Sequence, residues 1–176
     1  MSQTSLTDMG VSWRGIPLED CNRALVAWGH KMGEMRRVDF GQEAAHGLLH
    51  DGRLVAVACT SGLVRESVGG APWLNRGNCV ELSRVCAERP NLCRVVIRMW
   101  REFTWPDFKI PAAVSYQDAC LHSGDLYRFD GWEKIAESKG GGSVDQRTGR
   151  VGRDLIKWQW PHGWRPMNPP TPEPGR

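Results

Sequence analysis

The segment PAAVSYQDACLHSGDLYRFDGW, residues 111–132, carries three structural signals in succession. Its apolar start, residues 111–116, predicts a short buried strand. A polar loop follows, residues 125–128 predict a brief helix, and Gly131 is typical of a helix end. The segment therefore predicts a strand–loop–helix unit, after which residues 132–137 resume as a strand.

A similar unit precedes it. Residues 79–86 (CVELSRVC) predict a second buried strand, with Val80, Leu82 and Val85 among its apolar members. Pro90 then marks the entry to a helix. Its apolar residues recur at helical spacing and arginines occupy the other side; the apolar set is Leu92, Val95, Val96, Met99 and Phe103, and the basic set is Arg94, Arg98 and Arg101.

The first third of the chain predicts a strand, a helix and a hairpin. Residues 11–13 form the strand, and Pro17 opens a helix with Leu18, Cys21, Leu25 and Trp28 on one face. Residues 46–50 and 53–59 flank Asp51-Gly52, a dipeptide that tolerates positive φ at both turn positions. Residues 62–77 are expected to be a loop carrying Trp73, and residues 155–160 a final alternating strand.

This order of elements indicates an α+β (α/β-like) fold with a mixed, mostly antiparallel sheet and flanking helices. We expect residues 11–161 to form a single domain, after a flexible N-terminus at residues 1–10. Residues 162–176 are rich in proline and poor in apolar side chains, so we expect an extended or disordered tail.

Composition limits the possible functions only loosely. The net charge of +3 and the pI of 8.6 permit a nucleic acid partner without the strongly basic character of a dedicated DNA-binding protein. Six cysteines without a CxxC pair favour a reducing cytoplasm and no zinc site. The chain shows neither a signal peptide nor a membrane-spanning stretch, so we expect a soluble cytoplasmic protein.

Two junctions could hold a ligand. The strands at residues 80–86 and 112–116 are expected to run parallel and to splay at their carboxyl ends, leaving a crevice. The junction at residues 86–94 places backbone N–H groups and arginines at a helix N-terminus, which suits a phosphate or pyrophosphate. An ordinary helix start is the alternative.

The second junction gathers groups that can exchange protons near neutral pH. Ser115, Tyr116 and Asp118 are followed by His122 and Tyr127. The alternative is structural: Tyr127 would pack against the sheet, Asp118 would cap a turn, and His122 would be a surface residue.

These residues resemble the late signature of the bacteriophage Mom proteins, in which Ser-Tyr-x-Asp is followed by His-x-Gly, by x-Tyr, and by Gly-Trp or Gly-Phe. Here the matching residues are 115–118, 122–124, 126–127 and 131–132. The resemblance extends upstream through residues 81–84, the hairpin at 50–55 and His30, and covers roughly residues 28–161. Lys31 follows that histidine where many relatives have tyrosine, and Pro90-Asn91 replaces a glycine-rich loop.

The resemblance implies a GCN5-related N-acetyltransferase-like fold, splayed at its central strands, and an enzyme that adds a methylcarbamoyl or other acyl group to the exocyclic amine of adenine in phage DNA. Such a group would protect DNA from restriction in the host cytoplasm. The resemblance also implies an acyl donor such as acetyl-CoA, and iron has been suggested for the family. It further implies catalytic roles for Ser115, Tyr116, Asp118, Tyr127 and His30. The residues it implies for donor binding are Arg84, Val85, Cys86, Arg89, Asn91, Leu92, Cys93 and Arg94.

In this hypothesis Asp118 or His30 accepts the amine proton and Tyr127 protonates the leaving thiolate. The adenine must leave the base stack, so we expect aromatic stacking and phosphate contacts. The residues assigned to DNA are Lys31, Arg147, Arg150, Arg153, Trp73 and Trp158. Two alternatives stay open: an acyltransferase acting on a protein or small-molecule amine, and a non-catalytic nucleic-acid binding module.

Overall fold

The computed structural model describes residues 9–37, 39–140, 144 and 151–167. The fold is α+β, and the chain divides into two compact units. Unit 1 comprises Met1–Gly62 and Glu81–Lys109, and unit 2 comprises Leu63–Val80 and Ile110–Arg176. Every strand ladder within either unit is antiparallel, so the predicted α+β class with a mostly antiparallel sheet is confirmed.

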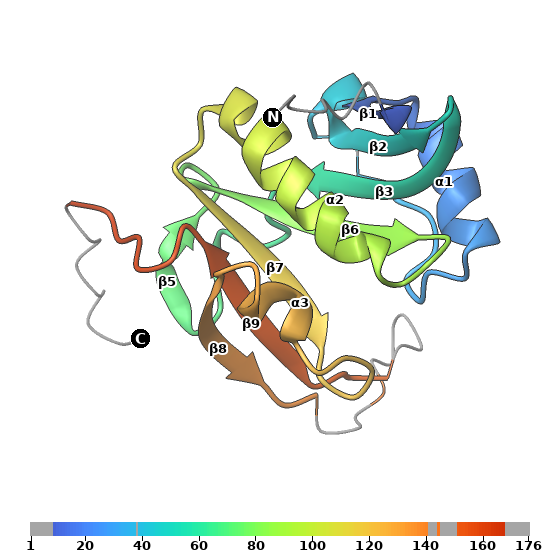
Figure 1. Ribbon diagram of the computed structural model, residues 1–176. Helices are drawn as coiled ribbons and strands as arrows, with labels where there is room; N and C mark the ends of the chain where they lie inside the picture. Colours follow the sequence, from blue (N-terminus) through green and yellow to red (C-terminus); the bar gives the residue numbers. More distant parts are fainter. Residues whose placement is uncertain (1–8, 38, 141–143, 145–150, 168–176) are drawn as a thin grey trace, which may run out of the picture. The chain divides into compact units, whose positions relative to one another are not determined.

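Unit 1 contains four neighbouring strands in the order β1, β2, β3, β6 (Figure 1). Their bounds are Val11–Gly15, Ala45–His50, Arg53–Ser61 and Cys79–Ala87, the last beginning two residues before the unit does. The turn between β2 and β3 has positive φ at Asp51 (49°) and Gly52 (76°), as the sequence predicts for this dipeptide. A short 3₁₀ turn, η2 (Gly41–Ala44), leads into β2.

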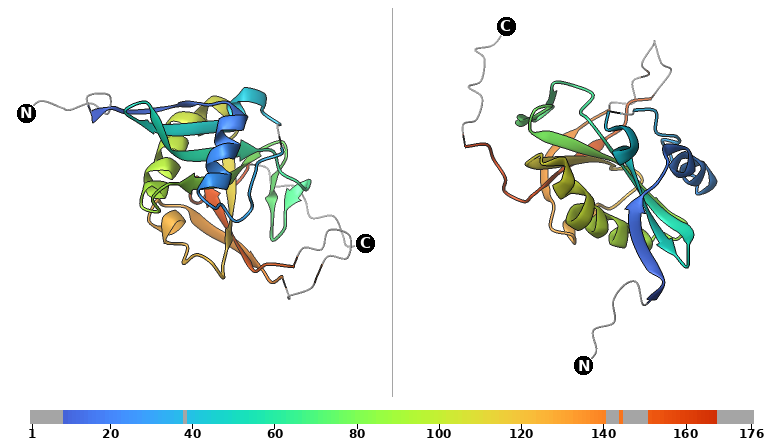
Figure 2. Two further views of the ribbon diagram at one scale, coloured as in Figure 1. Left: turned by 90° about the vertical axis from the view of Figure 1, so that its right-hand side faces the viewer. Right: turned by 90° about the horizontal axis from the view of Figure 1, so that it is seen from above.

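Helices α1 (Leu18–Ala27) and α2 (Leu92–Met99) cover opposite faces of these strands (Figure 2). The apolar face predicted for α1 is confirmed, because Cys21 and Leu25 are fully buried and Leu18 and Trp28 pack against the same cluster. Burial of this stripe is the main stabilising contribution of the helix.

The predicted helix after Pro90 begins at Leu92 and changes its geometry at Trp100. A π-helical turn, η3 (Trp100–Thr104), and a 3₁₀ turn, η4 (Trp105–Phe108), follow α2. A π turn rotates later residues out of α-helical register. Two apolar predictions are wrong. Phe103 lies within the π turn and is 59% exposed. Val95 comes before the turn and is 43% exposed, at the edge of a stripe formed by Val96, Ile97, Met99 and Trp100.

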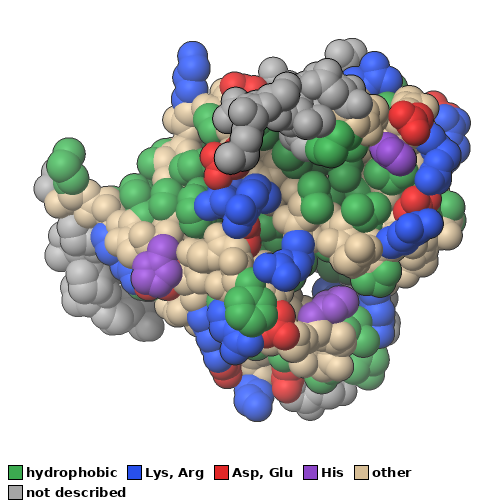
Figure 3. All heavy atoms as spheres, viewed as in Figure 1, with side chains coloured by type: hydrophobic (Ala, Val, Ile, Leu, Met, Phe, Trp, Pro, Cys, Tyr) green, Lys and Arg blue, Asp and Glu red, His purple; other side chains and the backbone are tan. Residues whose placement is uncertain are grey.

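The outer surface of α2 mixes basic and apolar side chains. Figure 3 shows blue Lys and Arg side chains over this helix, in the same view as Figure 1. Arg94 and Arg98 are exposed, as predicted. Arg101 differs, because its side chain is only 13% exposed and pairs with Glu102 at 3.0 Å.

Unit 2 contains a three-stranded ladder in the order β7, β9, β8 and a hairpin, β4–β5. Their bounds are Ala112–Asp118, Leu155–Trp160 and Glu133–Ser138 for the ladder, and Ser67–Val68 and Ala71–Asn75 for the hairpin. The prediction of a loop at residues 62–77 is therefore wrong in part. The hairpin forms because Val68, Ala71 and Leu74 bury their side chains in one cluster with Ala112 and Val114 of β7.

The short helix α3 (Asp125–Arg128) matches its prediction and begins after Gly124, whose φ of 82° favours glycine.

Elsewhere in unit 2, Glu133 of β8 anchors residues that follow β9. Its carboxylate accepts hydrogen bonds from the Arg165 guanidinium (3.0 and 3.2 Å) and from Gly163 N–H (2.8 Å). The described part of the proposed tail, residues 162–167, is therefore attached to β8 through Glu133.

Candidate active site

The strand–loop–helix unit of the opening segment places Tyr127 against Ser115. Tyr127 comes from α3 and Ser115 from the middle of β7, and their hydroxyl oxygens lie 2.9 Å apart, with either able to donate. Both residues are buried. Both are predicted catalytic residues, and the structure brings them into direct contact.

Aromatic rings fix the plane of Tyr127. Trp158 of β9 stacks on it with ring centroids 5.5 Å apart and planes 15° from parallel. Trp132 meets it edge to face, with centroids 5.6 Å apart and planes at 74°. Such pairs add stabilisation beyond area burial. Trp158, assigned to base stacking, thus has one face of its buried ring covered by Tyr127.

Strand alternation separates the predicted catalytic residues of β7. Successive side chains on a strand point to opposite faces. Ser115 contacts Tyr127, whereas Tyr116 packs with the hairpin cluster that includes Val114 and Leu74. Tyr116 therefore lies on the other face of the ladder from the Ser115–Tyr127 pair.

Both carboxylate oxygens of Asp118 have partners. Oδ1 accepts the backbone N–H of Cys120 at 3.1 Å, and Oδ2 lies 3.6 Å from Nη1 of Arg153. Asp118 therefore closes a turn, as its structural alternative predicts, and also pairs with a residue assigned to phosphate. His122 is exposed, and its carbonyl accepts a hydrogen bond from Gln117. Arg147 and Arg150 lie outside the described residues.

His30 and Lys31 follow α1 in unit 1. His30 Nδ1 accepts the backbone N–H of Met32 at 3.3 Å. A neutral imidazole that accepts at Nδ1 carries its proton on Nε2, where it can donate but not accept. Lys31 is exposed.

The predicted donor-binding segment spans β6 and the start of α2. Val85 and Cys86 pair with Ala58 and Val57 of β3. Arg84 is buried, and its guanidinium donates to the carbonyls of Ser83 (2.7 Å) and Gly33 (3.5 Å).

At the helix entry two backbone N–H groups are already hydrogen-bonded within a turn. The N–H groups of Leu92 and Cys93 donate to the carbonyls of Arg89 (3.0 Å) and Pro90 (3.1 Å). Arg89, Asn91 and Arg94 are exposed. The crevice expected between this junction and that of β7 stays a prediction, because the two junctions belong to different units.

Trp73 of β5 lies in a second polar cluster of unit 2. Its indole N–H donates to Oε1 of Gln159 at 2.9 Å, and the Arg165 guanidinium lies 4.3 Å from its ring centroid. This is a cation–π contact. Trp73, the other tryptophan assigned to base stacking, therefore also has one ring face covered within its own unit.

Gln117 and Glu81 are buried polar residues to which the sequence analysis gives no role. Gln117 of β7 is 3% exposed and contacts both the loop before α3 and Trp158. Glu81 of β6 is paired with Arg37, whose two Nη atoms lie 2.9 and 3.3 Å from its carboxylate oxygens. The period of two along β7 could have indicated Gln117, because it places that residue on the face of Ser115.

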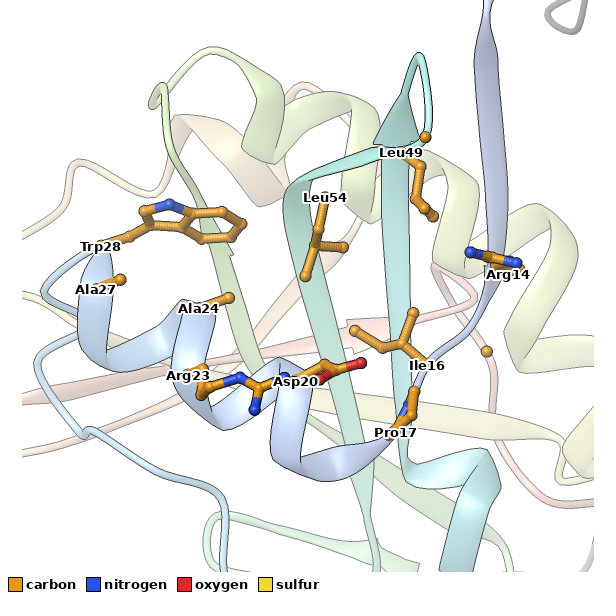
Figure 4. A pocket seen from close by; sticks show the side chains of 12 residues that line it. Arg14, Ile16, Pro17, Asp20, Arg23, Ala24, Ala27, Trp28, Leu49 and Leu54 are labelled. Atoms are coloured by element: carbon orange, nitrogen blue, oxygen red, sulfur yellow. Dashed lines mark hydrogen bonds and ion pairs between the residues drawn. The ribbon is translucent and has the colours of Figure 1, made fainter.

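Unit 1 has a surface pocket that is lined by none of the predicted catalytic, donor-binding or DNA-binding residues. It lies between α1 and the β2–β3 hairpin, where Ile16, Leu49 and Leu54 project toward the helix (Figure 4). Three charged residues line it: Asp20 and Arg23, which are paired with each other, and Arg14. The pocket therefore offers an apolar floor and no group suited to proton transfer.

Most of the cysteine thiols are part of the core. Cys21, Cys59, Cys79 and Cys86 are buried, and the sulfur atoms of Cys21 and Cys59 lie 3.2 Å apart. Among the described residues no group of three or more His, Cys, Asp or Glu side chains is placed to hold a metal ion, and we assign no residue to iron. No described helix is long and apolar enough to cross a membrane.

No protein-family model and no curated protein sequence matches the chain. Solved structures of N-acetyltransferases do, and they identify the fold as that of the GCN5-related N-acetyltransferases. A probable acetyltransferase from Staphylococcus epidermidis has a TM-score of 0.60 at 12% identity, covering 85% of this chain and 98% of its own.

Two further solved structures share this fold. The ribosomal-protein-S18-alanine N-acetyltransferase from Escherichia coli has a TM-score of 0.58 at 12% identity, covering 90% of this chain and 97% of its own. The diaminobutyrate acetyltransferase from Paenibacillus lautus, solved with its substrate and coenzyme A, has a TM-score of 0.55 at 11% identity, with coverages of 84% and 93%. At these identities the similarity concerns the fold, and the narrower resemblance to Mom proteins stays a prediction.

Proposed function

We propose that this protein transfers an acyl group from a coenzyme A thioester to an amine. The fold it shares with N-acetyltransferases supports the reaction class. The observation that carries the proposal is the buried hydrogen bond between Tyr127 and Ser115, which holds a phenol in one orientation. A non-catalytic module would need no such fixed proton donor.

The chemistry needs a proton donor at sulfur. The amine nitrogen attacks the thioester carbonyl carbon, a C–N bond forms, and the C–S bond breaks as the thiolate leaves. The nitrogen gives up a proton to solvent water, and the thiolate gains one. In the proposal Tyr127 supplies the second proton.

Ser115 would ease that transfer. A phenol has a pKa of about 10 and a thiol of about 8.5, so giving the proton to the thiolate is uphill. A hydroxyl that donates to the phenolate favours its charged form. The Ser115 hydroxyl at 2.9 Å is placed to do so.

The proposal is tested by coenzyme A release from acetyl-CoA, followed with a thiol reagent. The acceptors are a panel: a diamine, a peptide with an N-terminal alanine, and an adenine-containing oligonucleotide. Amine-dependent release supports the proposal, and release no faster than in buffer with every acceptor contradicts it. Acetyl-CoA should also raise the melting temperature, because a ligand that binds the folded chain stabilises it.

The narrower form of this proposal takes the exocyclic amine of adenine in DNA as the acceptor. It is supported by the resemblance of residues 115–132 to the Mom signature. Extruding the base would cost a few kcal/mol. Nucleoside analysis of DNA from cells expressing the protein should reveal a modified adenosine that is lost in Tyr127→Phe, and finding only unmodified nucleosides would defeat this narrower form.

A further inference from the structure

Gln117 lies at the centre of the contacts that hold Tyr127. Its side-chain amide is buried in unit 2, and both ends have partners. Nε2 donates to the carbonyl of His122 at 2.6 Å, and Oε1 accepts the indole N–H of Trp158 at 2.7 Å. One side chain therefore joins the loop before α3 to the strand β9.

The first contact sets where α3 begins. His122 stands two residues before Gly124, whose carbonyl accepts the N–H groups of Tyr127 (3.1 Å) and Arg128 (3.0 Å). Gly124 is packed tightly on the same amide, since a Cβ built there would lie 2.6 Å from Oε1 of Gln117. The backbone that carries Tyr127 thus starts from residues fixed by Gln117.

The second contact sets the plane of the ring. Trp158 stacks on Tyr127 at 15° from parallel, and its indole N–H is oriented by Oε1 of Gln117. A Cβ at Gly124 would also lie 2.9 Å from Cζ2 of Trp158. Gln117, Gly124 and Trp158 therefore form one packed layer beside the tyrosine.

We propose that Gln117 is a positioning residue that sets the orientation of the Tyr127 hydroxyl for proton transfer, an inference that rests on the proposed acyltransferase function. The two hydrogen bonds of the Gln117 side chain go to His122 and Trp158, not to Tyr127. It acts through the loop and through Trp158.

The chain offers a direct probe and a matched control. Tyr116 and Tyr127 are its only tyrosines, so a sample labelled on tyrosine ring carbons gives two signals, and Tyr116→Phe identifies that of Tyr127. Gln159 is also a fully buried glutamine of unit 2, but it contacts Trp73 and the carbonyls of Pro161 and Trp164. Gln159→Leu removes an equally buried amide elsewhere.

The experiment compares Gln117→Leu, Gln117→Glu and Gln159→Leu by the NMR signal of Tyr127 and by steady-state kinetics with acetyl-CoA. Gln117→Leu removes both contacts, and Gln117→Glu keeps an acceptor for Trp158 but loses the donor to His122. Both should shift the Tyr127 signal, with the larger shift in Gln117→Leu, and Gln159→Leu should leave it in place. We expect kcat to fall about 10- to 100-fold in Gln117→Leu while the KM for acetyl-CoA stays within about two-fold, as for a displaced catalytic group.

Failure of the inference and failure of the function are distinguishable. An unchanged Tyr127 signal in both Gln117 variants, or an equal shift in Gln159→Leu, overturns the positioning role whether or not the wild type is active. If the wild type is inactive but the Tyr127 signal moves only in the Gln117 variants, the catalytic part of the proposal is overturned and the structural part is kept.

Discussion

The hydroxyl oxygen of Tyr127 lies 2.9 Å from Oγ of Ser115, and the two side chains meet inside unit 2 with Trp158 stacked on the tyrosine ring. A buried pair of hydroxyls contributes to stability through its hydrogen bond and to chemistry through its proton. These two contributions can be separated by mutation.

Tyr127→Phe keeps the ring and removes the hydroxyl. We expect the acetyl-transfer kcat to fall by about 100-fold or more, the usual contribution of a general acid. The free energy of unfolding should fall by about 1 kcal/mol, because the Ser115 hydroxyl loses its partner. Urea unfolding measures the second effect. In Tyr127→Phe/Ser115→Ala stability should partly return and activity should not; recovery of activity would contradict the role of Tyr127.

The Arg37–Glu81 pair in unit 1 should contribute strongly to stability. The Glu81 side chain is 10% exposed and that of Arg37 32%. Arg37→Met leaves a buried carboxylate without its partner and should lower the free energy of unfolding by about 3 kcal/mol. The double variant Arg37→Met/Glu81→Leu should recover most of this loss. A double variant less stable than Arg37→Met would contradict the interpretation.

The Glu133–Arg165 contact predicts a pH-dependent stability. Hydrogen bonding from Arg165 lowers the pKa of Glu133 from its ordinary value of 4.5. A lowered carboxyl pKa stabilises the folded chain above pH 4.5, and this contribution disappears as the pH falls through the lower folded value. At pH 7 Arg165→Met should therefore cost on the order of 1 kcal/mol, since the pair is partly exposed.

Thermal melts of wild type and Arg165→Met from pH 7 down to pH 3 measure this effect. The difference in melting temperature should narrow as the pH falls below 4.5. A difference that stays constant over this range would assign the effect of Arg165 to its packing on Trp73 instead.

The cysteines should react in an order set by burial. Cys120 is exposed and should be alkylated first by iodoacetamide at pH 8. Burial raises the pKa of the Cys93 thiol to about 11, so its reaction should be slow and should accelerate as the pH approaches that value, because the thiolate is the nucleophile. Cys21 and Cys59 should react only after unfolding. Peptide mass spectrometry gives the order, and early alkylation of Cys59 would contradict the buried core of unit 1.

Local patterns predicted most of the fold. The Asp51-Gly52 turn and the strand at Leu155–Trp160 follow from alternation and turn chemistry that involve only neighbouring residues. The hairpin β4–β5 escaped prediction because Pro72 and several glycines resemble a loop, and its strands are stabilised by burial against β7, a segment distant in the sequence. The exposure of Phe103 depends on a π-helical turn that the apolar spacing does not indicate.

The candidate site was predicted in part. The motif named Ser115 and Tyr127, which do meet, but also Tyr116, which alternation places on the other face of the ladder. Gln117 was missed as a functional residue because its partners are a backbone carbonyl and Trp158, 41 residues later in the chain. A sequence pattern does not reveal which buried polar side chains become partners across such a separation.

Transfer of the acetyl group itself can be followed directly. Purified protein is incubated with acetyl-CoA radiolabelled in the acetyl group and with the amine panel, and the products are separated. With the wild type the label should move into an amide of one of the amines, and with Tyr127→Phe it should do so at about one hundredth of that rate or less. Label that stays in the thioester, or transfer at the wild-type rate by Tyr127→Phe, would contradict the proposed acyl transfer.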